Sequence, residues 1–259
     1  MGRFIKERLA SDKLVRVFAV GRIVHPVMFD LFGLAGDFDT VWLDQEHGGL
    51  SYDQIRMASI CCRANGFDSF VRMAPTDYSR VTQNLEAGAG GLMAARIESA
   101  DHAEQFMQWA KFAPRGSRGM NTSGRDSDYT YKTQVDFAAD ANRDHFISIQ
   151  IETLGALKDA DKIAAIDGVD LLFVGPSDLS QALGHLGEIG HTKVWEAIDR
   201  VAAACQKHGK HWGTVGPTPE YAGRAIEKGC RMISMASDLL AVRRGIESLK
   251  TAYAPFFKS

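Results

Sequence analysis

The sequence has little of what marks several common classes of protein. It has only four cysteines among 259 residues, and neither a CxxC motif nor a zinc-ligand spacing relates Cys61, Cys62, Cys205 and Cys230. Its 30 basic residues are balanced by 32 acidic ones and form no basic stripe, so we expect no nucleic-acid partner. It lacks any run of 18 apolar residues, so we expect no membrane-spanning helix. These absences favour a cytoplasmic protein that keeps its thiols reduced.

What the sequence does have is a regular alternation of strand-like and helix-like segments. Apolar runs of strand length recur eight times, at 15–23, 38–43, 69–73, 91–97, 146–151, 170–174, 211–215 and 231–235. Helical patterns follow them at 26–35, 52–64, 78–87, 102–111, 156–166, 194–208, 219–228 and 239–251. Eight such units in about 250 residues predict an α/β fold, a single (β/α)₈ TIM barrel domain over residues 1–259. A doubly wound sheet is the alternative, but no glycine-rich dinucleotide loop follows the first strand.

One stretch breaks this rhythm. Residues 114–132, between the fourth and fifth strand-like runs, are rich in glycine, serine, aspartate and arginine. A loop of this length inside a compact domain is usually a lid or a disordered insertion. We therefore expect a long loop at 114–132.

Two carboxylates stand where consecutive strands of this pattern end. Glu152 closes the fifth run, and Asp178 follows the sixth after a helical segment between the two. A strand, a helix and a strand in this order form a parallel pair through a right-handed crossover, so both acids emerge at the carboxyl edge of the sheet, on strands roughly 5 Å apart. Taken singly, each acid could have a purely structural role, Asp178 as a helix cap and Glu152 as an acid in the first turn of a helix. Two acids that converge repel unless a cation joins them, so we predict that both are ligands of a divalent metal ion.

Other polar residues are expected on the same rim, because a barrel carries its chemistry at the carboxyl ends of its strands. The second run ends at Asp44-Gln45-Glu46-His47, the third at Val71-Arg72, and the helix after it at Leu85-Glu86-Ala87-Gly88. A histidine of near-neutral pKa suits proton transfer, and a guanidinium suits the stabilisation of negative charge that develops on an oxygen. His47 also precedes two glycines, so a purely structural role in a turn competes with that of a base.

With these motifs the sequence resembles the class II pyruvate aldolases of the HpcH/HpaI type, the hydroxyketoacid aldolases of the phosphoenolpyruvate/pyruvate superfamily. The resemblance covers essentially the whole chain, with the motifs in the family's order and spacing. They are Asp44-Gln45-Glu46-His47, Val71-Arg72, Leu85-Glu86-Ala87-Gly88, Arg115-Gly116-Ser117-Arg118-Gly119, Gln150-Ile151-Glu152-Thr153 and Gly175-Pro176-Ser177-Asp178-Leu179-Ser180. The last two motifs together are the most specific.

The resemblance implies a metal-dependent lyase. Mg²⁺, Mn²⁺ or Co²⁺ would be bound by Glu152 and Asp178, and pyruvate or a related 2-oxo acid would chelate the ion. The enolate would add reversibly to an aldehyde to give a 4-hydroxy-2-oxo acid. The resemblance also implies a homo-hexamer in which the last helix is exchanged between subunits.

It further implies individual roles. His47 would be the base, Glu86 would pair with it, and Arg72 would face the keto oxygen. Residues that would hold the 2-oxo acid are Gln150, Ser177, Asp178 and Arg72. No lysine follows the strand-end pattern that a Schiff-base aldolase needs.

This chain departs from the family pattern at three places. Glu86 stands where the family usually has an aspartate, and residues 120–132 differ from the family's loop on the side of the aldehyde acceptor. Towards the end of the fourth run the chain has Met93-Ala94-Ala95-Arg96, where members of the family carry a proline and an apolar residue. Arg96 would either favour an anionic acceptor or product or simply pair with Glu98 or Glu86.

Two other functions remain open. An acyl-CoA lyase of the same superfamily would need a basic surface for the nucleotide phosphates, and no such cluster is evident in the sequence. A barrel that binds a 2-oxo acid without turning it over would be expected to lack the base or the metal ligands, and these are present here.

Overall fold

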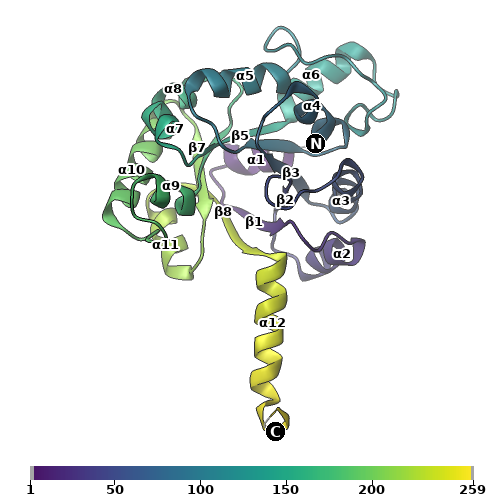
Figure 1. Cartoon of the computed structure of the whole chain (residues 1–259). Coiled ribbons are helices and arrows are strands. Elements are labelled where there is room, and N and C mark those ends of the chain that lie inside the picture. Colours follow the sequence, from purple (N-terminus) through teal and green to yellow (C-terminus); the bar gives the residue numbers. More distant parts are fainter. Residues whose placement is uncertain (1–2, 258–259) are drawn as a thin grey trace.

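Eight parallel strands form a closed barrel in the computed structural model, which describes residues 3–257 (Figure 1). They are β1 (Val15–Val20), β2 (Thr40–Asp44), β3 (Asp68–Met73), β4 (Gly91–Ala94), β5 (Phe146–Ile151), β6 (Leu171–Val174), β7 (His211–Val215) and β8 (Cys230–Ser237). Each strand pairs with its neighbours in the sequence, and β8 pairs with β1 to close the barrel. The predicted (β/α)₈ fold is confirmed, and every predicted strand run overlaps one observed strand.

Helices surround the barrel. They are α1 (Arg3–Ala10), α2 (Pro26–Ala35), α3 (Tyr52–Ala64), α4 (Tyr78–Glu86), α5 (Ala100–Ala110), α6 (Gln134–Asp144), α7 (Leu154–Lys158), α8 (Ala160–Ala165), α9 (Pro176–Ala182), α10 (Thr192–Lys207), α11 (Pro219–Glu227) and α12 (Asp238–Ala252), with 3₁₀ turns at Arg125–Ser127 and Ala254–Phe256. The helix predicted at 156–166 is broken into α7 and α8 at Asp159, whose carboxylate accepts the N–H of Ala100 at 3.1 Å. Within residues 3–257, no helix combines the length and the apolar character needed to cross a membrane.

Three helices have no counterpart in the apolar pattern of the sequence. α1 buries only Ile5 and Leu9 as large apolar residues, and α6 buries only Phe137 and Ala141. α9 is seven residues long and begins at a proline. α1 and α6 therefore have too few buried positions, and α9 is too short, to set up a helical period that can be read from the chain.

The barrel interior is filled by side chains, and α1 closes its amino end. The interior cluster consists of Ile5, Leu9, Val15, Val17, Trp42, Phe70, Met93, Phe146, Leu171, Phe173 and Met232. Ile5 and Leu9 of α1 belong to it together with Val15 and Phe146, which begin their strands. Because this end is plugged, the carboxyl ends of the strands are left for chemistry, as is usual in such barrels.

The long loop between α5 and α6 is packed down on the barrel rather than free. Arg118 and Asp126 are both buried, and the guanidinium donates to the carboxylate at 2.6 Å. The hydroxyl of Tyr78 accepts the N–H of Gly119 at 2.6 Å, which fastens the loop to α4. The loop expected at 114–132 is therefore neither an open lid nor a disordered insertion in this structure.

α12 leaves the barrel and projects away from it (Figure 1). At its root, burial opposes ionisation of Asp238, but the backbone N–H groups of Gly21, Arg22 and Ile23, at 2.7–3.0 Å, outweigh burial and lower its pKa. Only Asp238 of this helix is buried. Apolar side chains are exposed at spacings of three and four residues, at Leu239, Val242, Ile246, Leu249 and Tyr253. These five residues, the α12 stripe, lie on one face of the helix.

Candidate active site

The pairing of β5 with β6 brings together the two predicted metal ligands. Ile151 lies opposite Val174, so Glu152 and Gly175 follow side by side at the carboxyl ends of neighbouring strands. α9 then begins at once and carries Asp178 in its first turn. The parallel crossover predicted from the sequence is the one that the structure shows.

Glycine at position 175 allows the loop after β6 to pass close to Glu152. A Cβ at this position would stand 2.6 Å from Gln150 Nε2 and 2.9 Å from Glu152 Oε2. Any side chain would therefore displace one of these two groups. The sequence marks Gly175 only as part of a motif, and its contact with the carboxylate becomes visible only in three dimensions.

Two donors hold the buried carboxylate of Glu152. Its Oε1 accepts the backbone N–H of Arg96 at 2.7 Å, and its Oε2 accepts the side-chain amide of Gln150. Arg96 has φ +57°, a left-handed conformation that is uncommon outside glycine, and in this conformation its N–H reaches the carboxylate. The backbone of Arg96 is thus a part of the site that the sequence could not indicate.

The side chain of Arg96 follows one of its two expected interpretations. Its Nη2 lies 3.7 Å from Glu98 Oε1, and both side chains are more than half exposed. An exposed ion pair of this kind contributes at most about 1 kcal/mol to stability.

The electrostatics around Glu152 call for positive charge. Burial is the main reason that the pKa of Glu152 is raised to about 7, and the charges of Glu46 and Asp178 act in the same direction. The N–H of Arg96 and the charge of Arg72 lower the pKa but do not outweigh the other effects. Glu46 and Asp178 therefore lie near enough to Glu152 to repel it, and a cation among them would relieve that repulsion.

Arg72 is held in place by acids that follow β2. Its Nε and Nη2 donate to the two carboxylate oxygens of Asp44 at 3.0 and 2.7 Å, and Nε lies 3.3 Å from Glu46 Oε2. The guanidinium carbon lies 4.7 Å from the centre of the Trp42 ring. Among the residues described, Nη1 has no hydrogen-bond partner, so it can donate to a ligand oxygen. Sequence reasoning assigned the arginine but not the acids that orient it.

His47 and Glu86 are not joined in this structure. His47 is exposed in the turn after β2, and its backbone N–H reaches Asp44 Oδ1 at 3.3 Å. Burial raises the pKa of Glu86, while a side-chain hydrogen bond with Asn121 of the long loop lowers it. No hydrogen bond between the His47 and Glu86 side chains occurs in the described part of the chain, so their catalytic roles stay predictions.

The remaining groups of the rim fit a hard cation. Gln150 Oε1 is buried and accepts no hydrogen bond within the described residues. Glu46 Oε2 is buried too and has only its ion pair with Arg72, while Ser177 and Asp178 are exposed. Carboxylate and amide oxygens without donors are ligands of the type that Mg²⁺ and Mn²⁺ prefer. These carboxylates do not place three ligand atoms within 4.8 Å of one another. The chemistry of these groups would suit a hard divalent cation, and its ligation by Glu152 and Asp178 stays a prediction.

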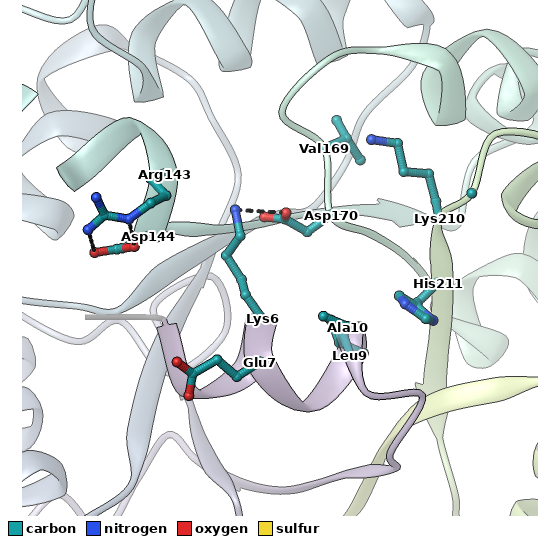
Figure 2. Close-up of a pocket in the computed structure, with 11 residues that line it drawn as sticks. Lys6, Glu7, Leu9, Ala10, Arg143, Asp144, Val169, Asp170, Lys210 and His211 are labelled. Carbon is teal, nitrogen blue, oxygen red and sulfur yellow. Dashed lines mark hydrogen bonds and ion pairs between the residues drawn. The ribbon is translucent and has the colours of Figure 1, made fainter. Parts of the chain in front are cut away.

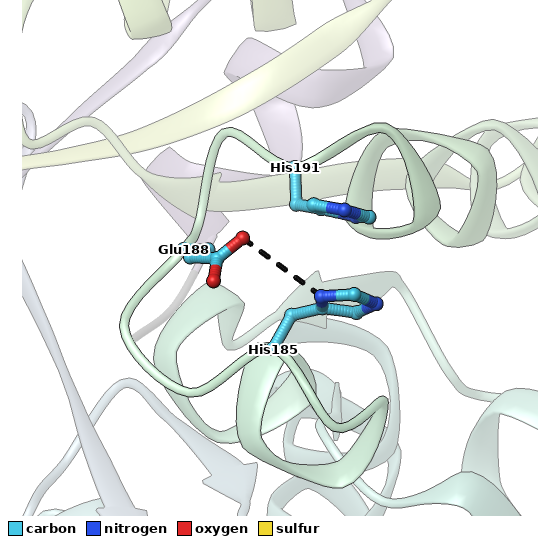
Figure 3. Close-up of side chains that lie close together, drawn as sticks. All are labelled: His185, Glu188 and His191. Carbon is cyan, nitrogen blue, oxygen red and sulfur yellow. Dashed lines mark ion pairs between the residues drawn. The ribbon is translucent and has the colours of Figure 1, made fainter.

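A separate group of possible metal ligands lies in the loop between α9 and α10 (Figure 3). His185, Glu188 and His191 have ligand atoms within 4.8 Å of one another. The two imidazole rings are stacked, with centroids 3.6 Å apart and planes inclined by 17°, and His191 Nδ1 accepts the N–H of Lys193 as the cap of α10. The lone pairs of imidazole lie in the ring plane, so rings stacked in this way do not both point at one ion. The stacked arrangement therefore does not present these three residues as a formed metal site.

A cavity of about 700 Å³ lies at the other end of the barrel (Figure 2). Its lining includes Lys6 of α1, Asp170 before β6 and His211 at the start of β7. Lys6 Nζ pairs with Asp170 Oδ1 at 3.0 Å. This cavity is at the amino ends of the strands and contains none of the predicted catalytic groups.

Fold and rim together define the class of protein. Acids, an amide and an arginine gather at the carboxyl ends of β2, β3, β5 and β6, which is where (β/α)₈ barrel enzymes carry their active sites.

Comparison with known proteins is specific about the family. The family described as HpcH/HpaI aldolase/citrate lyase matches residues 23–244. The chain is 32% identical over 231 residues to a 5-keto-4-deoxy-D-glucarate aldolase of Klebsiella pneumoniae subsp. pneumoniae, which covers 89% of each chain. It is 31% identical over 248 residues to a protein of the same name from Shigella boydii serotype 18, covering 96% of this chain and 95% of the relative. The crystal structure of an HpcH/HpaI aldolase from Desulfitobacterium hafniense DCB-2 superposes with a TM-score of 0.89 at 28% identity, covering 96% of this chain and 97% of that one.

The protein belongs to the HpcH/HpaI aldolase/citrate lyase family. The family predicted from the motifs is thereby confirmed, and so is the expectation of an enzyme of the aldolase type.

The packing around Gly175 generates the first prediction. We expect Gly175→Ala to weaken Mn²⁺ binding by roughly 10–100-fold, because the new methyl group would displace the Gln150 amide or the Glu152 carboxylate. Isothermal titration with Mn²⁺ measures the affinity, and a thermal melt checks the fold. Gly190→Ala is the matched control, since a Cβ there meets no atom within 4 Å. Wild-type affinity in Gly175→Ala would show that the close approach is unnecessary.

Proposed function

We propose that this protein is a divalent-metal-dependent aldolase that reversibly joins pyruvate, or a closely related 2-oxo acid, to an aldehyde to give a 4-hydroxy-2-oxo acid. The observation that carries the proposal is the buried Glu152 carboxylate, which lies beside other acids with too few donors, in a chain of an aldolase family. Mg²⁺, Mn²⁺ and Co²⁺ are the candidate ions.

In this proposal Glu152 and Asp178 hold the cation. When bound, a divalent cation supplies a Lewis acid that polarises the keto and carboxylate oxygens of the 2-oxo acid. Gln150 donates to Glu152 and so fixes the orientation of that carboxylate. Ser177, in the first turn of α9, lies beside Asp178, where its backbone can hold the carboxylate of the 2-oxo acid.

Arg72 would then stabilise the charge that develops on the keto oxygen, and His47 would transfer the proton. Arg72 is fixed by Asp44, and its Nη1 would donate to the keto oxygen, where negative charge develops as the methyl group loses a proton. His47 would take that proton and return it in the reverse direction. We assign Glu86 to the positioning of His47, as the family resemblance implies.

The named relatives support a proposal about the substrate class. Proteins about one-third identical to this chain are named for 5-keto-4-deoxy-D-glucarate. We propose a substrate of the same type, a 2-oxo sugar acid whose cleavage gives pyruvate or a close analogue and an aldehyde that itself bears a carboxylate.

The α12 stripe and the projecting helix support a proposal about assembly. Within the stripe, Ile246 and Leu249 are 52% and 59% exposed, and Phe256 beyond it is 84% exposed. Apolar faces of this size on a helix without intramolecular partners are typical of subunit interfaces. We propose that α12 packs on a second copy of this chain in a homo-oligomer, and the family resemblance favours a hexamer.

Metal ligation is tested by proton exchange. In D₂O with Mg²⁺ or Mn²⁺, we expect the wild-type protein to exchange the methyl protons of pyruvate, as followed by NMR, and chelator to stop the exchange. Glu152→Gln and Asp178→Ala should abolish metal-dependent exchange, because each removes one anionic ligand. Glu98→Gln removes an exposed acid outside the ligand pair and serves as the control. Wild-type rates in Glu152→Gln would contradict the assignment of the ion.

The assignment of the base is tested with the same exchange. We expect His47→Ala to slow exchange by roughly 10²–10⁴, because it removes the proton acceptor. Glu86→Gln should slow exchange less, since no hydrogen bond links Glu86 to His47 among the described residues. Added imidazole should partly restore His47→Ala, and His102→Ala is a control for the loss of a histidine. If His47→Ala exchanged at the wild-type rate, another group would be the base.

Assembly is tested by a change on the α12 stripe. We expect Leu249→Asp to reduce the molar mass measured by light scattering after size-exclusion chromatography, because a buried aspartate opposes packing of the stripe. Ser248→Asp, which lies on α12 but outside the stripe, is the matched control. An unchanged mass in Leu249→Asp would contradict the proposed interface.

A further inference from the structure

A second cavity, of about 410 Å³, opens beside Arg72 at the carboxyl ends of the strands. Its walls come from β1, β2, β7 and β8, from Gly216 and Pro217 after β7, and from the first turns of α12. Arg72 and Asp44 line it, whereas Glu152 and Asp178 do not. The cavity therefore begins at the residue assigned to the keto oxygen and extends away from the two metal ligands.

One wall of this cavity carries cations without counter-ions. Arg243 and Arg244 of α12 line it together with Arg72. Asp44 is the acid among the lining residues, and both of its carboxylate oxygens are already bound by Arg72. Within residues 3–257, Arg243 and Arg244 make no ion pair, and both are exposed. Two free guanidinium groups on one wall are suited to a planar anion such as a carboxylate.

Trp42 also lines the cavity and is only 6% exposed. Its indole nitrogen has no hydrogen-bond partner among the residues described, but the nitrogen is itself covered and does not face a ligand in the cavity. Trp42 therefore contributes an apolar wall to the cavity.

We propose that this cavity is the acceptor subsite and that Arg243 and Arg244 bind a carboxylate at the far end of the aldehyde. The inference rests on the proposed function, because it takes the donor 2-oxo acid to lie on the other side of Arg72. A volume of about 410 Å³ lies within the range of small-molecule sites and accommodates an aldehyde acid of a few carbons. In this arrangement Arg243 and Arg244 of α12 determine the selectivity for acidic acceptors.

The test compares aldehydes that differ in charge. With pyruvate as donor, kcat/KM is measured for succinic semialdehyde, for butanal as the uncharged aldehyde of the same chain length, and for glyceraldehyde 3-phosphate. We expect Arg243→Ala/Arg244→Ala to lose roughly 10–100-fold on succinic semialdehyde and less than about 3-fold on butanal, because a charged hydrogen-bonded contact is lost only with the former. Arg243→Lys/Arg244→Lys should recover part of the loss. Arg200→Ala removes an arginine from α10, outside this cavity, and is the control.

The possible outcomes separate this inference from the proposed function. Equal losses on succinic semialdehyde and butanal would show a structural role for the arginines and overturn the subsite. A larger loss on the phosphorylated aldehyde than on the carboxylated one would overturn the choice of carboxylate. Metal-dependent exchange of pyruvate protons in D₂O is the reference measurement: if the wild-type protein and the double variant both exchange but prefer the same aldehydes, the subsite alone is wrong. Lack of exchange in the wild-type protein would overturn the proposed function instead. Size-exclusion chromatography checks that each variant keeps the wild-type assembly.

Discussion

The burial of one carboxylate among other acids is the constraint to which the mouth of this barrel is adapted. Glu152 can be ionised there only if donors or cations approach it closely, and each neighbour contributes to that approach. Gly175 leaves space by having no side chain, and Arg96 adopts a left-handed conformation in which its N–H reaches the carboxylate. A left-handed non-glycine residue costs of order 1 kcal/mol or more, and an unpaired buried oxygen such as Gln150 Oε1 adds to the cost. In the proposed site, binding of a cation beside Glu152 would offset these costs.

The pairing of Arg72 with Asp44 explains why Arg72 does not supply the positive charge that Glu152 lacks. Arg72 lies close enough to lower the pKa of Glu152, yet its charge is largely neutralised by the two oxygens of Asp44 and by nearby Glu46. The mouth is thereby divided. The half at β5 and β6 has an excess of negative charge, whereas the half that reaches α12 has an excess of positive charge. A cation suits the first half and an anion the second, so a molecule with a metal-chelating end and a distant carboxylate would bind in one direction only.

The sequence predicted those features that depend on the order of elements. Parallel barrel strands are buried on both faces and read as continuous apolar runs, so all eight could be found, and the crossover from β5 to β6 placed Glu152 and Asp178 at one edge. Features that depend on contacts across the sheet could not be predicted in this way. Three such contacts join residues that no local pattern relates. They are the ion pair of Arg72 with Asp44, the hydrogen bond from the Arg96 N–H to Glu152, and the close approach of Gly175 to Glu152. α1 and α6 escaped detection because they bury too few residues to create a period, and α9 because it is only seven residues long. The buried pair of Arg118 and Asp126 likewise packs a loop whose composition is typical of a free one.

α12 takes part both in the proposed acceptor cavity and in the proposed assembly of the subunits. Its root is fixed by Asp238, its first turns carry Arg243 and Arg244 into the acceptor cavity, and its outer part presents the α12 stripe. A helix anchored at one end only leaves its side chains free to move. Ordering these side chains on binding costs entropy, and this cost lowers the affinity for the ligand. Packing of the stripe on a second copy would restrict the helix beforehand and lower the entropic cost of binding an anion at its root. Assembly and acceptor binding would then favour each other, since any state that orders α12 assists both.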